Sequence, residues 1–155
     1  MQPDSPFWKA MAKLIENNPI IIDRPKGSIH PRYVEAIYPL HYGYLENTTS
    51  SDGSGIDVWL GSSNAVMNNN GAKTLTGILC TFDTLTKYCT DNHVAAQLTT
   101  ISNRLEFEWR CGKLDAEIKL LIECSEEDIR VIRDFHKEMY VLYIPNPAVV
   151  NDLSN

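Results

Sequence analysis

The stretch from Ile20 to Leu60 reads IIIDRPKGSIHPRYVEAIYPLHYGYLENTTSSDGSGIDVWL, and it restricts the fold more than any other part of the chain. Carboxylates, cations and tyrosines are mixed there with glycines and prolines, which is poor material for a core. Pro39 prevents a helix near its centre, whereas the apolar runs at 20–22 and 58–60 predict strands. We therefore expect polar loops held on rigid strands, as functional sites usually are.

The segment DGSGID, which runs from Asp52 to Asp57, is the first candidate site. Its glycines allow a sharp turn that could aim both carboxylates at one point. Magnesium prefers carboxylate and water oxygens and usually keeps several waters for a phosphate substrate. Asp-Gly-Ser-Gly is also an ordinary hairpin turn, so the residues alone leave a metal site and a turn open.

The order of these parts resembles the family I soluble inorganic pyrophosphatases. The family signature has the form Y-P-x-x-Y-G-Y followed by D-G-D-x-x-D-V, and this chain has YPLHYGY at 38–44 and DGSGIDV at 52–58. Upstream, DRPKGS at 23–28 is similar to the family's E-I-P-K-G-S, in the wording of a short bacterial-style branch. The resemblance covers 20–61, is weaker over 75–87 and 114–144, and is absent elsewhere.

The resemblance implies an enzyme, an inorganic diphosphatase that uses Mg²⁺ to hydrolyse pyrophosphate, or a related phosphorylated small molecule, to phosphate. It also implies a fold: α+β and mainly β, a small closed OB-like β-barrel with an N-terminal and a C-terminal helix. The implied metal ligands are Asp23, Asp52, Asp57, Asp83 and Glu117. The implied substrate contacts are Lys26, Arg32, Tyr42 and Lys119, and the implied catalytic residues are Asp57, Tyr42 and Lys119.

Each of these residues also has a simpler interpretation. An acid after a strand can cap the strand end or shape a turn, and Arg32 can be a solvated side chain. Glu117 and Lys119 alternate onto one face of a strand, where they can form an exposed ion pair.

Two departures from the family pattern affect the expected activity. Ser54 stands where the family has the middle acid that accepts a proton from the attacking water, and losing a general base commonly costs about 10²–10⁴ in rate. The family's phosphate-binding arginine has no counterpart, because only residues 34–37 separate Tyr33 from Tyr38; Lys26 or Arg24 is a candidate replacement. We therefore expect a weakened pyrophosphatase.

Two alternatives stay open beside this expectation. One is a catalytically silent relative that binds phosphate or nucleotide. The other is a non-enzymatic β-barrel interaction module, in which the tyrosines and Trp59 form a binding face.

Residues 4–17 predict an amphipathic helix. Asp4 or Ser5 can cap it, and Pro6 suits its first turn. Its apolar face is expected either to close one end of the domain or to contact a second copy, so a homo-oligomer stays open.

Two further strands and a helix are predicted in the second half of the chain. The strands lie at 74–82 and 115–122. The helix begins at Ser125 and carries His136 and Lys137 on a solvated face.

The remaining segments complete a single domain over 1–155. Residues 88–113 match nothing around them and are expected to be an atypical insert or an artefact of the gene model. Residues 145–155 are expected to be a frayed tail.

Composition restricts the class of protein. The 155 residues are 43% apolar and 22% charged, as in an ordinary soluble domain. A net charge of −6 argues against nucleic acid as a partner and suits a site that collects cations. Neither a membrane-spanning run nor a signal-peptide core occurs, so a cytoplasmic location without membrane contact is expected. The four cysteines form no C-x-x-C pair and indicate neither zinc nor disulfides.

Overall fold

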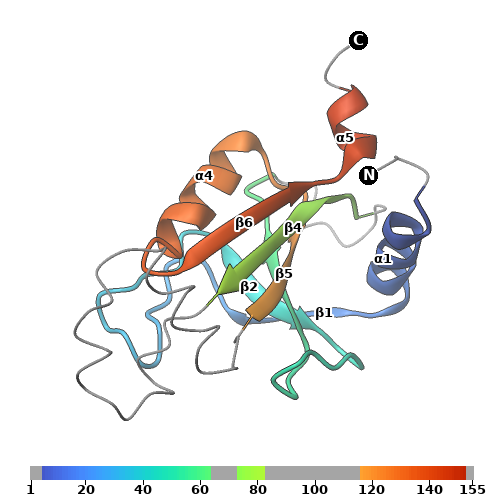
Figure 1. Cartoon of the computed structure of the whole chain (residues 1–155). Helices are drawn as coiled ribbons and strands as arrows, with labels where there is room; N and C mark the ends of the chain where they lie inside the picture. The colour runs from blue at the N-terminus through green and yellow to red at the C-terminus, as the bar shows by residue number, and fades with distance from the viewer. Residues whose placement is uncertain (1–4, 64–72, 83–115, 153–155) are drawn as a thin grey trace, which may run out of the picture.

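The computed structural model describes residues 5–63, 73–82 and 116–152, and one six-stranded mixed sheet forms its centre (Figure 1). The strands are β1 (Ile20–Arg24), β2 (His41–Leu45), β3 (Ile56–Leu60), β4 (Leu75–Phe82), β5 (Ala116–Ile122) and β6 (Tyr140–Pro145). The helices are α1 (Pro6–Asn17), α4 (Glu126–Phe135) and α5 (Pro147–Asp152). The strand order is β1-β2-β3-β5-β4-β6.

One parallel pair in this sheet determines where the polar side chains meet. β1, β2 and β3 pair antiparallel, and β4 pairs antiparallel with both β5 and β6. β3 and β5 are parallel, and Asp57 lies directly opposite Lys119. Residues far apart in the chain therefore become neighbours on one face of the sheet.

The sheet buries apolar side chains on both faces. Val58 belongs to a cluster with Trp8 and Ile15 of α1. The next residue along β3, Trp59, belongs to a second cluster with Ile132 of α4. Because neighbouring side chains of a strand point to opposite faces, α1 and α4 cover opposite sides of the sheet.

The expected closed barrel is wrong, although the α+β, mainly β class is confirmed. The sheet is not closed, and β1 and β6 form its edges among the described strands. A closed barrel encloses one interior, whereas this sheet has a helix packed on each face, as a layered domain does.

The predicted N-terminal helix is confirmed as α1. Ser5 is its N-cap and accepts a hydrogen bond from the backbone N–H of Phe7, and Pro6 is the first helical residue. Trp8 and Ile15 are buried in the core. The apolar face of α1 thus covers the sheet.

The predicted strands at 20–22 and 58–60 are confirmed within β1 and β3. Those at 74–82 and 115–122 are confirmed as β4 from Leu75 and, among the described residues, as β5 from Ala116. The predicted helix after Ser125 is confirmed as α4. It begins with a capping box, in which the Ser125 hydroxyl accepts from the N–H of Asp128 and the Asp128 carboxylate accepts from the N–H of Ser125.

The tail expected to be frayed, residues 145–155, includes the last residue of β6 and the helix α5 among its described residues. β6 and α5 follow α4, and β6 pairs with β4 along its length. The side chains of Val141 and Tyr143 pack against the cluster under α4. The open edge of β4 and this apolar surface together explain why YVLYIP forms a strand.

Several predictions fall on residues outside the described ranges. Asp83, the 88–113 segment, Cys89 and Cys111 are among them. Cys80 and Cys124 are free thiols. None of the helices in the described ranges has the length and apolar character needed to cross a membrane.

Candidate functional site

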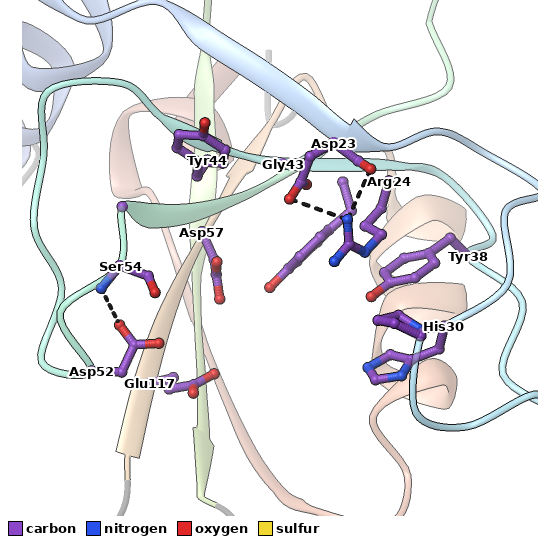
Figure 2. A pocket seen from close by; sticks show the side chains of 13 residues that line it. Asp23, Arg24, His30, Tyr38, Gly43, Tyr44, Asp52, Ser54, Asp57 and Glu117 are labelled. Atoms are coloured by element: carbon purple, nitrogen blue, oxygen red, sulfur yellow. Dashed lines mark hydrogen bonds and ion pairs between the residues drawn. The ribbon is translucent and has the colours of Figure 1, made fainter.

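A pocket of about 560 Å³ lies beside the ends of β1, β2 and β3. Asp52, Asp57 and Glu117 line one side of it, whereas Arg24 and His30 line the opposite side (Figure 2). The pocket therefore has an acidic side and an opposing side that carries a cation and aromatic rings.

Three separate segments supply the acidic side. Asp57 projects from β3, and Glu117 projects from β5, the parallel neighbour of β3. Asp52 comes from the glycine-containing turn before β3, where its Oδ1 accepts a hydrogen bond from the N–H of Ser54 at 2.9 Å. Gly53 has a φ of 87°, a backbone conformation that favours glycine. The turn and the metal-site interpretations of DGSGID are thus compatible.

Lys119 links the acidic side to the core. Its Nζ lies 2.6 Å from Asp57 Oδ2 and 2.9 Å from Glu117 Oε2, and it donates to the Tyr42 hydroxyl oxygen at 3.1 Å. Only 3% of Lys119 is exposed. The prediction that Glu117 and Lys119 share a face is confirmed, but the simpler picture of an exposed ion pair is wrong for Lys119.

The charge states of this cluster follow from its burial and contacts. Burial by itself would lower the pKa of Lys119, but its electrostatic contacts with Tyr42, Asp57 and Glu117 outweigh burial and raise that pKa well above its ordinary value. Burial raises the pKa of the Tyr42 hydroxyl far above its usual range. Lys119 is therefore an ammonium and Tyr42 a neutral phenol near pH 7.

The acidic side fits a magnesium ion that keeps part of its water shell. Asp57 Oδ2 and Glu117 Oε2 already converge on the Lys119 ammonium, so a magnesium ion would have to use the remaining oxygens of these two carboxylates. Within the described ranges, no three His, Cys, Asp or Glu side chains are close enough to form a complete protein cage. Magnesium usually needs only one or two carboxylates, together with waters and substrate phosphates.

The structure separates the other predicted site residues. Asp23 lines the pocket on the side of Arg24, and the two side chains form an ion pair at 3.3 Å. Lys26 and Arg32 are exposed and are not among the residues that line the pocket. Arg24, one of the two suggested replacements for the absent arginine, does line it.

An aromatic cluster behind the pocket was only partly anticipated. Tyr38 is 4% exposed and packs against Tyr42 and Trp59 with ring-centroid distances of 5.4 and 5.8 Å. Of the two tyrosines, Tyr38 serves mainly in packing, whereas the hydroxyl of Tyr42 contacts Lys119.

The solvated position predicted for His136 is wrong. His136 is buried, and its Nε2 accepts a hydrogen bond from Trp59 Nε1 at 3.3 Å. Burial, together with the positive charge of Lys119 and an electrostatic interaction with His30, lowers its pKa to about 3. Helical periodicity placed this residue at the end of α4, but the chain turns there and directs the ring inward.

His30 was not singled out by its sequence context. It lines the pocket, and its Nδ1 accepts hydrogen bonds from the N–H groups of Arg32 and Tyr33. The one local signal is its place in a proline-containing loop between β1 and β2.

No protein-family model matches this chain, and no curated protein matches it. The pocket and the sequence resemblance are therefore what indicate a function for this chain.

Proposed function

We propose that the chain binds pyrophosphate, or a closely related phosphorylated small molecule, together with Mg²⁺ and hydrolyses it slowly. The observation that carries this proposal is the meeting of Asp52, Asp57 and Glu117 from three chain segments at one pocket, next to Lys119 and Tyr42. These five residues belong to the set that the pyrophosphatase resemblance implies. Of the other members, Lys26 and Arg32 do not line the pocket, and Asp83 lies outside the described residues.

The net charge of the acidic side supports cation binding. Three carboxylates face one ammonium, so this part of the pocket stays negative near neutral pH. Asp57 and Glu117 would hold Mg²⁺, which when bound offsets phosphate charge and lowers the pKa of a coordinated water. A ligand with several phosphate charges would bind poorly without such a cation.

The donors that could reach a phosphate are the Tyr42 hydroxyl and Arg24, both of which line the pocket. Lys119 does not line it, and its three ammonium N–H groups already bind Asp57, Glu117 and Tyr42, so it holds these side chains in place rather than contacting the ligand. Tyr42 accepts a hydrogen bond from Lys119, and its hydroxyl also interacts with the Asp57 carboxylate, so a phosphate oxygen would compete with Asp57 for its proton. Arg24 can donate its planar guanidinium N–H groups to a phosphate from the opposite side.

Ser54 explains why we propose slow hydrolysis. Ser54 lines the pocket between Asp52 and the start of β3. A serine hydroxyl cannot act as a general base near pH 7, so the proton of the attacking water has no carboxylate acceptor at this position.

The test is phosphate release from pyrophosphate with and without Mg²⁺. Ser54→Asp should raise the rate by about 10²-fold or more, the contribution expected of a general base. Asp57→Asn should reduce the rate by at least about tenfold, because even changes to residues that only surround a bound metal commonly cost that much. Asp134→Asn, an exposed substitution on α4, is the matched control and should match the original chain. If Ser54→Asp brings no increase, the role given to this position is wrong.

A second candidate, a silent binder of phosphate or nucleotide, is favoured by Ser54 itself. It predicts Mg²⁺-dependent binding of imidodiphosphate, which resists hydrolysis, together with no phosphate release from pyrophosphate. Asp57→Asn should then weaken binding, whereas Asp134→Asn should leave it unchanged.

A further inference from the structure

The pocket is larger than its acidic side. Its volume of about 560 Å³ lies within the roughly 300–1,000 Å³ typical of sites for drug-sized ligands and cofactors. The acids occupy one side, and the loop between β1 and β2 supplies His30 and Tyr38 to the other (Figure 2). A bare diphosphate with its metal accounts for the acidic side and leaves the aromatic side without a ligand group.

His30 presents a ring whose orientation is fixed before any ligand binds. Its Nδ1 accepts hydrogen bonds from the N–H groups of Arg32 at 3.1 Å and Tyr33 at 3.3 Å. Both bonds require an Nδ1 without a proton, so the single proton of the neutral imidazole lies on Nε2. Burial and the charges of Arg24 and Arg32 lower the pKa of His30, which keeps the ring uncharged at pH 7.

The aromatic core supports this ring from behind. The planes of His30 and Tyr38 differ by 11°, with their centroids 5.9 Å apart. Tyr38 is in turn packed against Phe135 at 4.9 Å. The ring of Tyr33 also lies against His30, with a centroid distance of 4.9 Å and a tilt of 42°. A planar ligand group that packed on the part of His30 lining the pocket would therefore meet a surface that has little side-chain freedom left to lose.

Arg24 stands on the same side as His30, opposite the acids (Figure 2). Its Nη1 donates to the backbone oxygen of Asp23 at 3.0 Å and to the Asp23 carboxylate at 3.3 Å. These bonds orient the guanidinium and leave other N–H groups for a phosphate. The pocket thus offers carboxylates for a metal, a cation for a phosphate, and a ring for a planar group.

We propose that the preferred ligand is a nucleoside diphosphate, whose base is the planar group. Its base would lie against His30, and its diphosphate would lie between Arg24 and the acidic side. This inference depends on the proposed function, because it assigns the diphosphate and Mg²⁺ to the acidic side.

The test compares two ligands that resist hydrolysis at the anhydride position, α,β-methylene-ADP and methylenediphosphonate. Their affinities are measured by calorimetry at pH 7 with Mg²⁺. We expect α,β-methylene-ADP to bind about tenfold more tightly, since stacking of a base on a protein ring commonly contributes a factor of this order.

His30→Asn is the informative variant, because an asparagine side-chain oxygen can still accept the N–H bonds of Arg32 and Tyr33 while the ring is lost. The preference for the ADP analogue should then fall about tenfold. His41→Asn is the matched control. His41 Nδ1 also accepts a backbone N–H, that of Lys26 at 3.1 Å, and His41 does not line the pocket. This control should keep the preference.

The outcomes separate this inference from the proposed function. Equal affinities for the two ligands would overturn the inference and leave the proposed function in place. A preference that survives His30→Asn would also overturn it, because the base would then lie elsewhere. Failure of both ligands to bind with Mg²⁺ would overturn the proposed function and this inference together.

Discussion

Lys119 is held by two carboxylates and a phenol, and very little of it reaches solvent. We predict that Lys119→Met lowers the free energy of unfolding by about 3 kcal/mol, because it leaves Asp57 and Glu117 facing each other without a cation. This value is the lower end of the range for removing one partner of a buried ion pair, and we choose it because both carboxylates are partly exposed. Urea unfolding at pH 7 measures it, with Lys13→Met on the exposed side of α1 as the control.

The pH dependence of the Lys119 contribution has a definite sign. Its pKa is raised in the folded state, so its stabilisation is complete below the unfolded pKa of about 10.4 and is lost as the pH rises above that value. The free energy of unfolding should therefore differ between Lys119→Met and the original chain by the same amount at pH 7 and pH 9, because Lys119 keeps its proton over this range. If the two proteins differ in free energy of unfolding by less than about 1 kcal/mol at pH 7, Lys119 contributes no more than an exposed ion pair does, and the prediction is wrong.

His136 should make the protein sensitive to acid. Its pKa falls to about 3 in the folded state against about 6.5 when unfolded. Its contribution to stability is therefore complete above pH 6.5 and decreases as the pH falls toward 3, by about 1.4 kcal/mol per pH unit. In His136→Gln, the free energy of unfolding should lack this part of its dependence on pH. Unfolding at pH 7, 6 and 5 measures it, and parallel profiles for the two proteins would refute the prediction.

The two main helices begin with caps of different strength. The Ser125 hydroxyl takes part in a reciprocal capping box, and the Asp128 carboxylate also accepts from the N–H of Ser62 after β3 at 3.2 Å. The Ser5 hydroxyl accepts one longer bond of 3.3 Å. The start of α4 is therefore tied to the sheet as well as to itself.

We predict that Ser125→Ala lowers the free energy of unfolding by about 1–2 kcal/mol, the upper range for an N-cap. Ser5→Ala should cost about 0.5 kcal/mol, because its single bond is exposed and long. Chemical unfolding of both variants against the original chain tests the ranking. If both variants lose the same free energy of unfolding, the capping box of α4 contributes no more stability than the single bond of Ser5.

Ligand binding should stabilise the whole molecule, because the pocket joins β3 and β5 to the loops around them. At a methylenediphosphonate concentration 100-fold above Kd, with Mg²⁺, the gain is about 2.7 kcal/mol. For a chain of this size we expect a rise in Tm of about 5–10 °C. Thermal unfolding measures this rise, which Asp57→Asn should greatly reduce and Asp134→Asn should preserve. A rise without Mg²⁺ of the same size would refute the metal requirement.

The sequence by itself determined the local elements. Short β-branched and apolar runs predicted strands that the structure contains as β1, β3, β4 and β5. Ser5 and Ser125 marked the starts of α1 and α4. These features depend on residues a few positions apart, through side-chain periodicity and capping, so they can be read along the chain.

The family resemblance also selected Asp52, Asp57 and Glu117 as candidates, and the three share a pocket. The resemblance did not show which cations would join them. Lys26 and Arg32 were expected there, yet Arg24 lines the pocket. Neighbouring positions on a turn can point in different directions, and the direction follows from how the turn packs.

The tertiary structure alone decided which strands became neighbours and which faces were covered. Backbone N–H and C=O groups are the same in every strand, so local sequence does not specify that β3 pairs with β5 in parallel and brings Lys119 to Asp57. It likewise does not specify that helices cover both faces and leave the sheet open, or that His136 turns inward beneath Trp59. Each of these outcomes depends on contacts between distant residues, whose free energy exists only in the assembled fold.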